Sequence, residues 1–406
     1  MDSLSQITLG AAVGELLLGK KLGNRAMVWG AVIGTVPDLD VIGNYFLSDL
    51  QGLLFHRGIS HSILFSVIGA IALGWIVFKM YESKEHKWIA ISAKVISALV
   101  VLKVVHFVAS IFSDSPWAFM LFATIAILGF TWRHIKNRYL SGNWEKPQVS
   151  LREWQWAFFW IIATHILLDV FTLYGTQVFA PFSNYKAQFG TVSVADPLYT
   201  APFLLLLIAA SFYNRNSKKR EWLNKAGLIV SCLYLAITVS NKFAIDKQFN
   251  SEFDQAGLTV TRYSTNATIL NNVLWTCTAE TEDFYYVGDY SFFDEVPVDF
   301  FQIEKNHHLL RDIDDDPTIT ALRWFSDEFY CITEINDSLF FNDLRFGVFR
   351  NEKGEPTDFI FSFYLEDLGG EDGYKMHKYD GGPSEDARKN FFSNLIKRIK
   401  GKRLNS

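Results

Sequence analysis

The sequence predicts an α-helical polytopic membrane protein that ends in a soluble α+β domain. Half of its 406 residues are hydrophobic, and 20% are charged, below the roughly 25% of an average soluble protein. Mean hydropathy is positive, +0.12. Nearly all long apolar runs lie before residue 246. We therefore expect a membrane-embedded domain at 1–245 and a soluble domain at 246–406.

Charge and cysteine content exclude two classes of protein. A net charge of −5 gives no basic surface of the kind that binds nucleic acid, so we expect no nucleic-acid partner. Three cysteines are too few for a disulfide framework. Cys277 and Cys331 either pair in an oxidising compartment or remain free thiols. The sequence does not identify the partner of the domain at 246–406.

The membrane part begins with a short helical hairpin, followed by about six spans. The hairpin is predicted at 7–19 and 26–36, where several glycines allow two helices to approach closely. Six further segments approach the 20 apolar residues that a bilayer span needs: 61–81, 88–109, 115–132, 154–173, 194–213 and 225–245.

Basic residues predict the orientation of these spans. When the loops are assigned alternately to the two sides, sixteen Lys and Arg residues fall on one side, and only Arg57 and Lys186 fall on the other. Positive residues concentrate on the cytoplasmic side of membrane proteins. The N-terminus, the loops 37–60, 110–114 and 174–193, and the domain at 246–406 are therefore predicted to be extracytoplasmic.

The C-terminal region has the pattern of a mixed soluble domain. Near-alternation of apolar and polar residues predicts strands at 258–263 and 358–364, and two more are expected at 273–279 and 284–292. A helix is predicted at 385–399, with Ser384 as its N-cap and a basic final turn. These elements together indicate an α+β domain.

Ionisable residues at the outward ends of the spans predict a metal site. His165 and Asp169 are four residues apart, so they share one helix face, and Gly58 permits a turn that brings His56 and His61 together. Mixed imidazole and carboxylate ligands suit Zn²⁺, Mn²⁺ or Fe²⁺ better than Ca²⁺. Because six ligands exceed one tetrahedral site, a two-ion centre is also considered. The candidate ligands are Asp38, Asp40, His56, His61, His165 and Asp169.

Each of these residues also has an ordinary structural explanation. A histidine at a membrane edge can serve as an interfacial hydrogen-bonding group, and Asp196-Pro197 can begin a helix. Glu15 lies among apolar residues, where an unpaired carboxylate is unfavourable. We expect Glu15 to pair with Arg57, to hold a ligand histidine or to act as a general base.

Several short motifs resemble one bacterial family. They are Asp2–Gln6 with Gly10–Glu15, Pro37–Asp40, His56–Ser62, His165–Asp169, Tyr174–Gln177 and Asp196–Tyr199. In this order, over roughly residues 1–205, they resemble the membrane-bound metal-dependent hydrolases, some of which are under LexA control. The resemblance implies a multi-pass protein of the bacterial inner membrane, with the six residues above as metal ligands. Gln6 departs from the family pattern, because some members have His there.

The resemblance and the charged residues together lead to a functional hypothesis. A metal-activated water would attack an amphiphilic substrate, with a lipid phosphoester as the preferred candidate and membrane lipid as the surrounding partner. Arg57 would neutralise a phosphate-like oxyanion, and Glu15 or Asp196 would orient a ligand or carry a proton. Zn or Mn is expected, as one or two ions. The alternative is a metal-stabilised membrane scaffold or transporter without hydrolytic activity.

Overall fold

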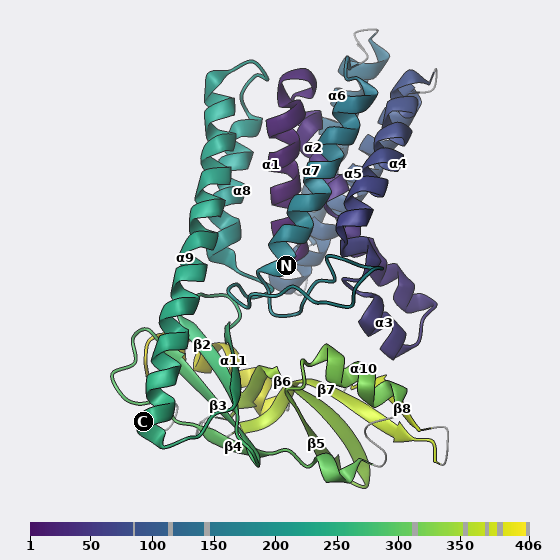
Figure 1. Cartoon of the computed structure of the whole chain (residues 1–406). Helices are drawn as coiled ribbons and strands as arrows, with labels where there is room; N and C mark the ends of the chain where they lie inside the picture. The colour runs from purple at the N-terminus through teal and green to yellow at the C-terminus, as the bar shows by residue number, and fades with distance from the viewer. Residues whose placement is uncertain are drawn as a thin grey trace. The chain divides into compact units, whose positions relative to one another are not determined.

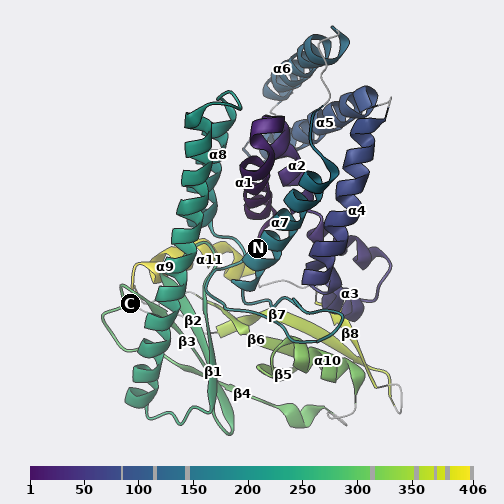
Figure 2. The same cartoon turned by 45° about the horizontal axis from the view of Figure 1, so that its top comes forward.

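The structure is a computed structural model that describes residues 1–83, 86–112, 117–141, 147–310, 316–351, 356–369, 373–379 and 385–402. The chain forms two compact units. One contains residues 1–67 and 159–406, and the other contains residues 68–158. Figures 1 and 2 show a bundle of helices and a domain of two β-sheets.

A tight helical hairpin opens the chain, as predicted. Helices α1 (Ser3–Leu22) and α2 (Asn24–Gly34) are joined at Gly23, whose φ of 61° is readily adopted only by glycine. A Cβ atom on Gly10 would lie 2.4 Å from the carbonyl oxygen of Gly30. The small residues therefore allow the two backbones to touch.

The segment after α2 is a chain of short elements. A 3₁₀-helix η1 (Pro37–Tyr45) is followed by α3 (Asp49–Phe55) and by a second 3₁₀-helix, η2 (Ile59–His61). Ser48 and Gln51 form a capping box that fixes the start of α3. This segment supplies half of the site described below.

Two neighbouring helices of the first unit, α8 (Pro197–Ser211) and α9 (Lys218–Ala256), precede the sheets in the chain. Helix α8 packs against α9, and both views show the two side by side. At 39 residues, α9 is about 58 Å long, more than a bilayer requires. The predicted domain boundary at 245/246 falls inside α9, so it remains a prediction from composition.

The described part of the second unit is mostly helical. It holds most of α4 (Ile63–Glu82), then α5 (His86–Phe112), α6 (Trp117–Ile135), the π-helical turn η3 (Lys136–Leu140) and the first half of α7 (Leu151–Val170). Tyr81 of α4 stacks on Trp154 of α7, with ring centroids 5.8 Å apart.

The expected number of six spans is not supported. Among the described residues, three helices are long and apolar enough to cross a membrane: α4, α6 and α9. A fourth span is obtained if α2 and η1, bent by 45°, count as one. Each of the six predicted apolar segments contains a helix in its described part, but α8 has only 15 residues, and α7 carries Glu153, His165 and Asp169. For these reasons α7 and α8 do not count among the helices that are long and apolar enough to cross a membrane.

Two four-stranded antiparallel sheets form the C-terminal domain. The first has the order β1-β2-β3-β4 and the second β5-β6-β7-β8. Their bounds are β1 Arg262–Ala267, β2 Leu274–Glu280, β3 Phe284–Ser291, β4 Phe301–Glu304, β5 Tyr330–Ile335, β6 Ser338–Arg350, β7 Pro356–Asp367 and β8 Tyr374–Lys378. Helices α10 (Pro317–Phe325) and α11 (Glu385–Ile399) and the 3₁₀-turn η4 (His307–Leu309) complete the domain.

Most of the predicted elements of this domain are confirmed. Strands β2, β3 and β7 and helix α11 lie where they were expected, whereas the strand predicted at 258–263 begins only at Arg262. The predicted cap, Ser384, lies outside the described residues. All three cysteines are described, and all three are free thiols, with Cys277 and Cys331 buried.

Hydrophobic contacts fix the sheets to the helices of the same unit. Ile245, Phe249 and Phe253 of α9 pack into a core with Trp275 and Cys277 of β2. Leu53 of α3 belongs to a second core, formed by α10 and the strands of the second sheet. The domain therefore contacts both the long helix α9 and the segment that carries η1 and η2.

Candidate metal centre

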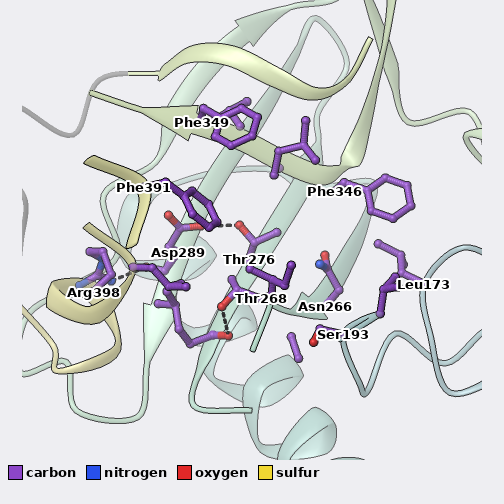
Figure 3. A pocket seen from close by; sticks show the side chains of 18 of the residues that line it. Leu173, Ser193, Asn266, Thr268, Thr276, Asp289, Phe346, Phe349, Phe391 and Arg398 are labelled. Atoms are coloured by element: carbon purple, nitrogen blue, oxygen red, sulfur yellow. Dashed lines mark hydrogen bonds between the residues drawn. The ribbon is translucent and has the colours of Figure 1, made fainter. Parts of the chain in front are cut away.

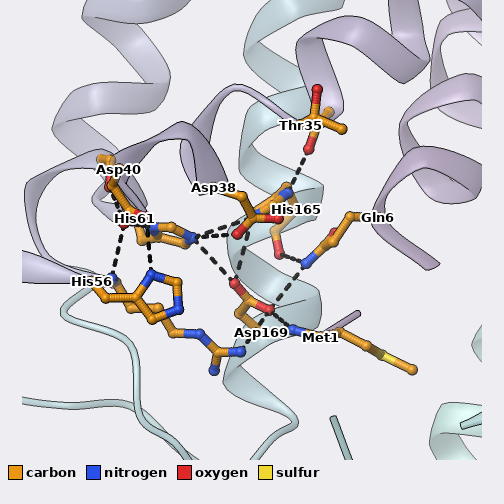
Figure 4. Close-up of polar contacts among 12 residues, drawn as sticks. Met1, Gln6, Thr35, Asp38, Asp40, His56, His61, His165 and Asp169 are labelled. Atoms are coloured by element: carbon orange, nitrogen blue, oxygen red, sulfur yellow. Dashed lines mark hydrogen bonds and ion pairs between the residues drawn. The ribbon is translucent and has the colours of Figure 1, made fainter. Parts of the chain in front are cut away.

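Four side chains from three elements converge on one point. Asp38 of η1, His61 of η2, and His165 and Asp169 of α7 each offer one ligand atom, and these atoms lie within 4.8 Å of one another. The Nε2 atoms of the two histidines are 3.3 Å apart. Each Nε2 atom is 3.4–3.5 Å from Asp38 Oδ1 and from Asp169 Oδ2. Figure 4 shows these side chains facing a common centre.

Local backbone structure explains the convergence. Pro37 occupies the first turn of η1 and fixes the start of the turn that carries Asp38. His165 and Asp169 are at i and i+4 on α7, as predicted. The turn before His61 is made by Arg57, whose φ is 60°. Gly58 itself has a negative φ of −85°, so the left-handed residue lies one position earlier than expected.

Both histidines are held by their other ring nitrogen. His165 Nδ1 lies 2.6 Å from the carbonyl oxygen of Gly34, which can only accept, so Nδ1 carries the hydrogen. In a neutral ring this leaves the Nε2 lone pair directed at the cluster. His61 Nδ1 lies 3.3 Å from Asp40 Oδ2. A carboxylate or a carbonyl behind each histidine is the usual arrangement around protein-bound metals.

The two carboxylate oxygens of Asp169 also differ in their contacts: one is held by supporting groups and the other faces the cluster. Oδ1 accepts a hydrogen bond of 3.0 Å from Gln6 Nε2 and another from the amino group of Met1. Oδ2 faces the histidines, is fully enclosed and has no hydrogen-bond partner in the described part of the chain. A buried carboxylate oxygen without a partner is unfavourable. A cation at the common centre would satisfy it.

The electrostatic surroundings favour a cation. Burial alone would favour the neutral ring, but the nearby carboxylates of Asp169, Asp38 and Asp40 raise the pKa of His61 to about 10. Three carboxylates thus stabilise positive charge at this point. One of them, Asp169, is also paired with the Arg57 guanidinium, which lies 3.4 Å from its Oδ1 atom. A divalent ion would compete with the proton for His61 Nε2.

The other two predicted ligands form a layer behind His61. Asp40 Oδ1 lies 2.9 Å from His56 Nδ1. Its Oδ2 accepts hydrogen bonds from the Arg57 backbone amide at 3.1 Å and from Ser60 Oγ at 2.9 Å. The side chain of His56 is 28% exposed. The structure places Asp40 and His56 outside the four-residue group, so they support the site rather than complete a second ion site.

Arg57 lies deeper than its proposed catalytic role requires. Its side chain is buried, and its guanidinium donates to Thr172 Oγ1 at 2.6 Å. It also lies 4.9 Å from the ring centroid of Tyr174. Arg57 therefore positions Asp169 and the turn after α7, and it is not open to a substrate.

Two residues predicted to be catalytic make other contacts in the structure. Arg220 binds both carboxylate oxygens of Glu15 at 2.6 Å, so the expected pairing of Glu15 with Arg57 is wrong. Asp196 caps α8 by accepting from the amides of Leu198 and Tyr199. Its Oδ2 accepts from Tyr234 at 2.7 Å. Neither carboxylate belongs to the cluster.

Sequence patterns did not indicate several of the groups that support the cluster. The carbonyl group of Gly34 could not be identified from the sequence, because every residue has a backbone carbonyl. Thr172 accepts a hydrogen bond from Arg57. It lies three residues after Asp169, so helical spacing could have placed it on the same face as that residue. Gln6 was noted only as a missing ligand, yet its amide donates to Asp169.

The apolar helices and the buried Asp/His group define a helical membrane protein with residues that could hold a metal ion. Residues 1–245 match the YdjM inner membrane protein family, and the chain belongs to that family. The match supports the expected inner-membrane location. Comparisons with curated proteins and with solved structures gave no match.

Proposed function

We propose that this protein is a divalent-metal-dependent hydrolase that cleaves an amphiphilic substrate at the outer surface of the bacterial inner membrane. The observation that carries the proposal is the enclosed Asp169 Oδ2, which has no hydrogen-bond partner among the described residues and faces the Nε2 atoms of His61 and His165. Asp38 completes a set of two nitrogens and two oxygens. This set suits Zn²⁺ or Mn²⁺.

The ligand number bears on the choice of metal. Four protein ligands complete a tetrahedral zinc site, whereas a catalytic zinc usually has three and keeps one position open. A six-coordinate ion such as Mn²⁺ keeps two positions for water and substrate. Because Asp40 and His56 bind each other, we propose one ion rather than two.

The chain's own residues would direct the chemistry. A bound divalent ion supplies the nucleophile by lowering the pKa of a coordinated water toward ~7. Asp40 and Gly34 hold the two imidazoles with Nε2 inward, and Arg57 and Gln6 hold Asp169. Asp38 is the one side chain of the four with appreciable exposure, 24%. We propose that the substrate approaches over Asp38.

The surroundings of Asp38 favour an amphiphilic substrate. Leu39, Val41 and Ile42 of η1 are each about half exposed, so apolar surface adjoins the ligand that is open to solvent. In the same unit, α1 begins beside Val194 and ends beside Arg215. The site therefore lies at the helix ends away from the basic loops. By the positive-inside rule, we propose that the site and the C-terminal domain are extracytoplasmic, and that the substrate is a lipid phosphoester.

The test compares metal content and turnover in the full-length protein purified in detergent. Elemental mass spectrometry should find one equivalent of Zn or Mn in the wild type and in His377→Ala, a histidine that pairs with Glu366 in β7. His61→Ala should lose the metal. Phospholipids and polyprenyl phosphates are then screened for metal-dependent hydrolysis. Absence of metal from the wild type, or equal metal in His61→Ala, would overturn the proposal.

A second function is favoured by the enclosure of the site. His61, His165 and Asp169 are at most 1% exposed, and four ligands are typical of structural zinc. We therefore keep a metal-stabilised scaffold without hydrolytic activity as the alternative. In that case the chelator-treated protein should lose thermal stability, and no metal ion should yield turnover on any lipid tested.

A further inference from the structure

The C-terminal domain contains a cavity that the metal centre does not use. Its volume is about 360 Å³, within the usual range for small-molecule sites. It is lined by strands β1, β2 and β3 of the first sheet, β6 and β7 of the second sheet, helix α11 and loop residues. Figure 3 shows the labelled side chains from these elements converging on the space.

The lining suits an apolar ligand. Phe346, Phe349, Phe361 and Phe391, with Val348 and Ile360, form much of the wall. The charged groups at the cavity are already neutralised. Asp289 Oδ2 pairs with Arg350 Nε at 2.9 Å, and Arg398 binds Asp294 at 2.8 and 2.9 Å. No unpaired charge is therefore offered by these groups, which argues against a strongly ionic occupant.

Asn266 brings a buried amide group to the wall of the cavity. Asn266 of β1 is 8% exposed, and its Oδ1 accepts no hydrogen bond within the described residues. Rotation of the side-chain amide by half a turn exchanges the positions of its oxygen and nitrogen, so Asn266 can present either atom to the cavity. An occupant with an apolar body and one hydroxyl or amide donor would match the apolar wall and satisfy this amide.

The loop after α7 connects this cavity with the metal centre. Leu173, Tyr174 and Val192 contribute to the wall, and they follow the helix that carries His165 and Asp169. The Tyr174 ring also lies 5.3 Å from the ring of His56 and 4.9 Å from the Arg57 guanidinium. Tyr174 thus lies between the cavity and the residues that surround the metal ligands.

We propose that this cavity binds the acyl chain of a membrane-derived lipid that carries a hydrogen-bond donor. An acyl chain matches the aromatic and aliphatic lining, and a lipid is available to a chain that carries helices apolar enough to cross a membrane. The inference deepens the proposed function and rests on it, because it names the part of the amphiphilic substrate that is recognised away from the metal ligands.

Photolabelling of the full-length protein in detergent tests the proposal. The probe is monopalmitin with a diazirine near the methyl end of its acyl chain, because it is uncharged and carries hydroxyl donors. Labelled peptides are identified by mass spectrometry, and labels on membrane helices serve as an internal reference. Peptides of β1, β2 and β6 should be labelled. Val348→Trp, which fills the cavity, should reduce their label by at least about tenfold, whereas Ile335→Trp, exposed and outside the cavity, should not.

Further variants keep the test decisive if Val348→Trp misfolds. Ile360 lines the cavity but is 42% exposed, so Ile360→Trp can be accommodated and should also reduce the label. Monopalmitin, which has hydroxyl donors, should displace the probe at lower concentration than methyl palmitate, which has none. Asn266→Leu should remove that difference.

Two results would overturn the inference: label confined to membrane helices, or equal label in Val348→Trp and Ile335→Trp. The metal variant His61→Ala should keep the β-sheet label, since it lies outside the cavity. Sheet label without any lipid hydrolysis would refute the proposed function alone. Lipid hydrolysis without sheet label would refute the cavity assignment alone.

Discussion

Replacing Asp40 by Asn tests whether the layer behind His61 prepares the site for metal. Asp40 Oδ2 lies 3.3 Å from His61 Nδ1, and the carboxylate accepts from the Arg57 amide and Ser60. An Asn side chain keeps only one acceptor oxygen and turns an NH₂ group toward these donors. The change removes no metal ligand, so its effect reports on orientation.

The expected loss in metal affinity follows from similar supporting groups elsewhere. Removing the carboxylate behind a ligand histidine typically weakens metal binding about 10- to 100-fold, which corresponds to about 1.4–2.8 kcal/mol. The assay is competition for Zn²⁺ or Mn²⁺ with a chromophoric chelator, using the full-length protein in detergent. His61→Ala, which removes a ligand, should lose more affinity than Asp40→Asn.

Asp196→Asn is the matched control for this measurement. Asp196 is also a buried aspartate, but it caps α8, and Asn is an equally good N-cap. Its metal affinity should stay within about twofold of the wild type, because distant sites act independently. Wild-type affinity in Asp40→Asn would refute the orientation argument. An equal loss in Asp196→Asn would restore Asp196 to the site.

Three further predictions concern stability in detergent. Glu15→Ala should destabilise the protein by about 3–5 kcal/mol, because it leaves Arg220 buried without its partner; thermal unfolding should fall while metal content stays unchanged. Gly14→Ala should lower the free energy of unfolding by about 1–3 kcal/mol, since its Cβ would lie 2.5 Å from a backbone oxygen. The control Gly129→Ala, whose Cβ would have nothing within 4 Å, should be neutral or stabilising by up to ~1 kcal/mol. Equal melting temperatures for the two variants would contradict the close packing of the hairpin. Burial and a neighbouring arginine lower the pKa of Lys186 to about 8, so the unfolded chain binds more protons between about pH 8 and 10.5. Wild-type stability relative to Lys186→Arg should rise with pH across that range, and a flat or falling difference would refute the assignment.

The helices could be predicted because each apolar run is continuous in sequence. The spans could not be counted so easily, since length and charge decide them: α8 is short, and α7 contains the polar site residues. The misplaced start of β1 has a different cause. Leu258 and Val260 alternate as strand residues do, but they pack against the α9 core instead of pairing with a strand.

The site was predictable where its spacing is local and not where it depends on tertiary contacts. The i, i+4 pair of His165 and Asp169 can be identified from sequence. Sequence spacing does not show whether an aspartate faces the Nε2 or the Nδ1 atom of a histidine. Asp40 was therefore predicted as a ligand, although it lies on the Nδ1 side of His61. Glu15 and Arg220 are 205 residues apart, and no local pattern indicates that they pair.

The C-terminal domain lies beyond the family match, yet it packs against the surroundings of the metal ligands. The Tyr174 ring, which contacts Arg57 and His56, lies 5.2 Å from the Phe325 ring of α10. Lys186, from the same loop, binds the last carbonyls of α10. The four ligands themselves all come from residues 38–169. Substitutions in the sheets should therefore change which substrates reach the site, while metal affinity remains a property of the helical part.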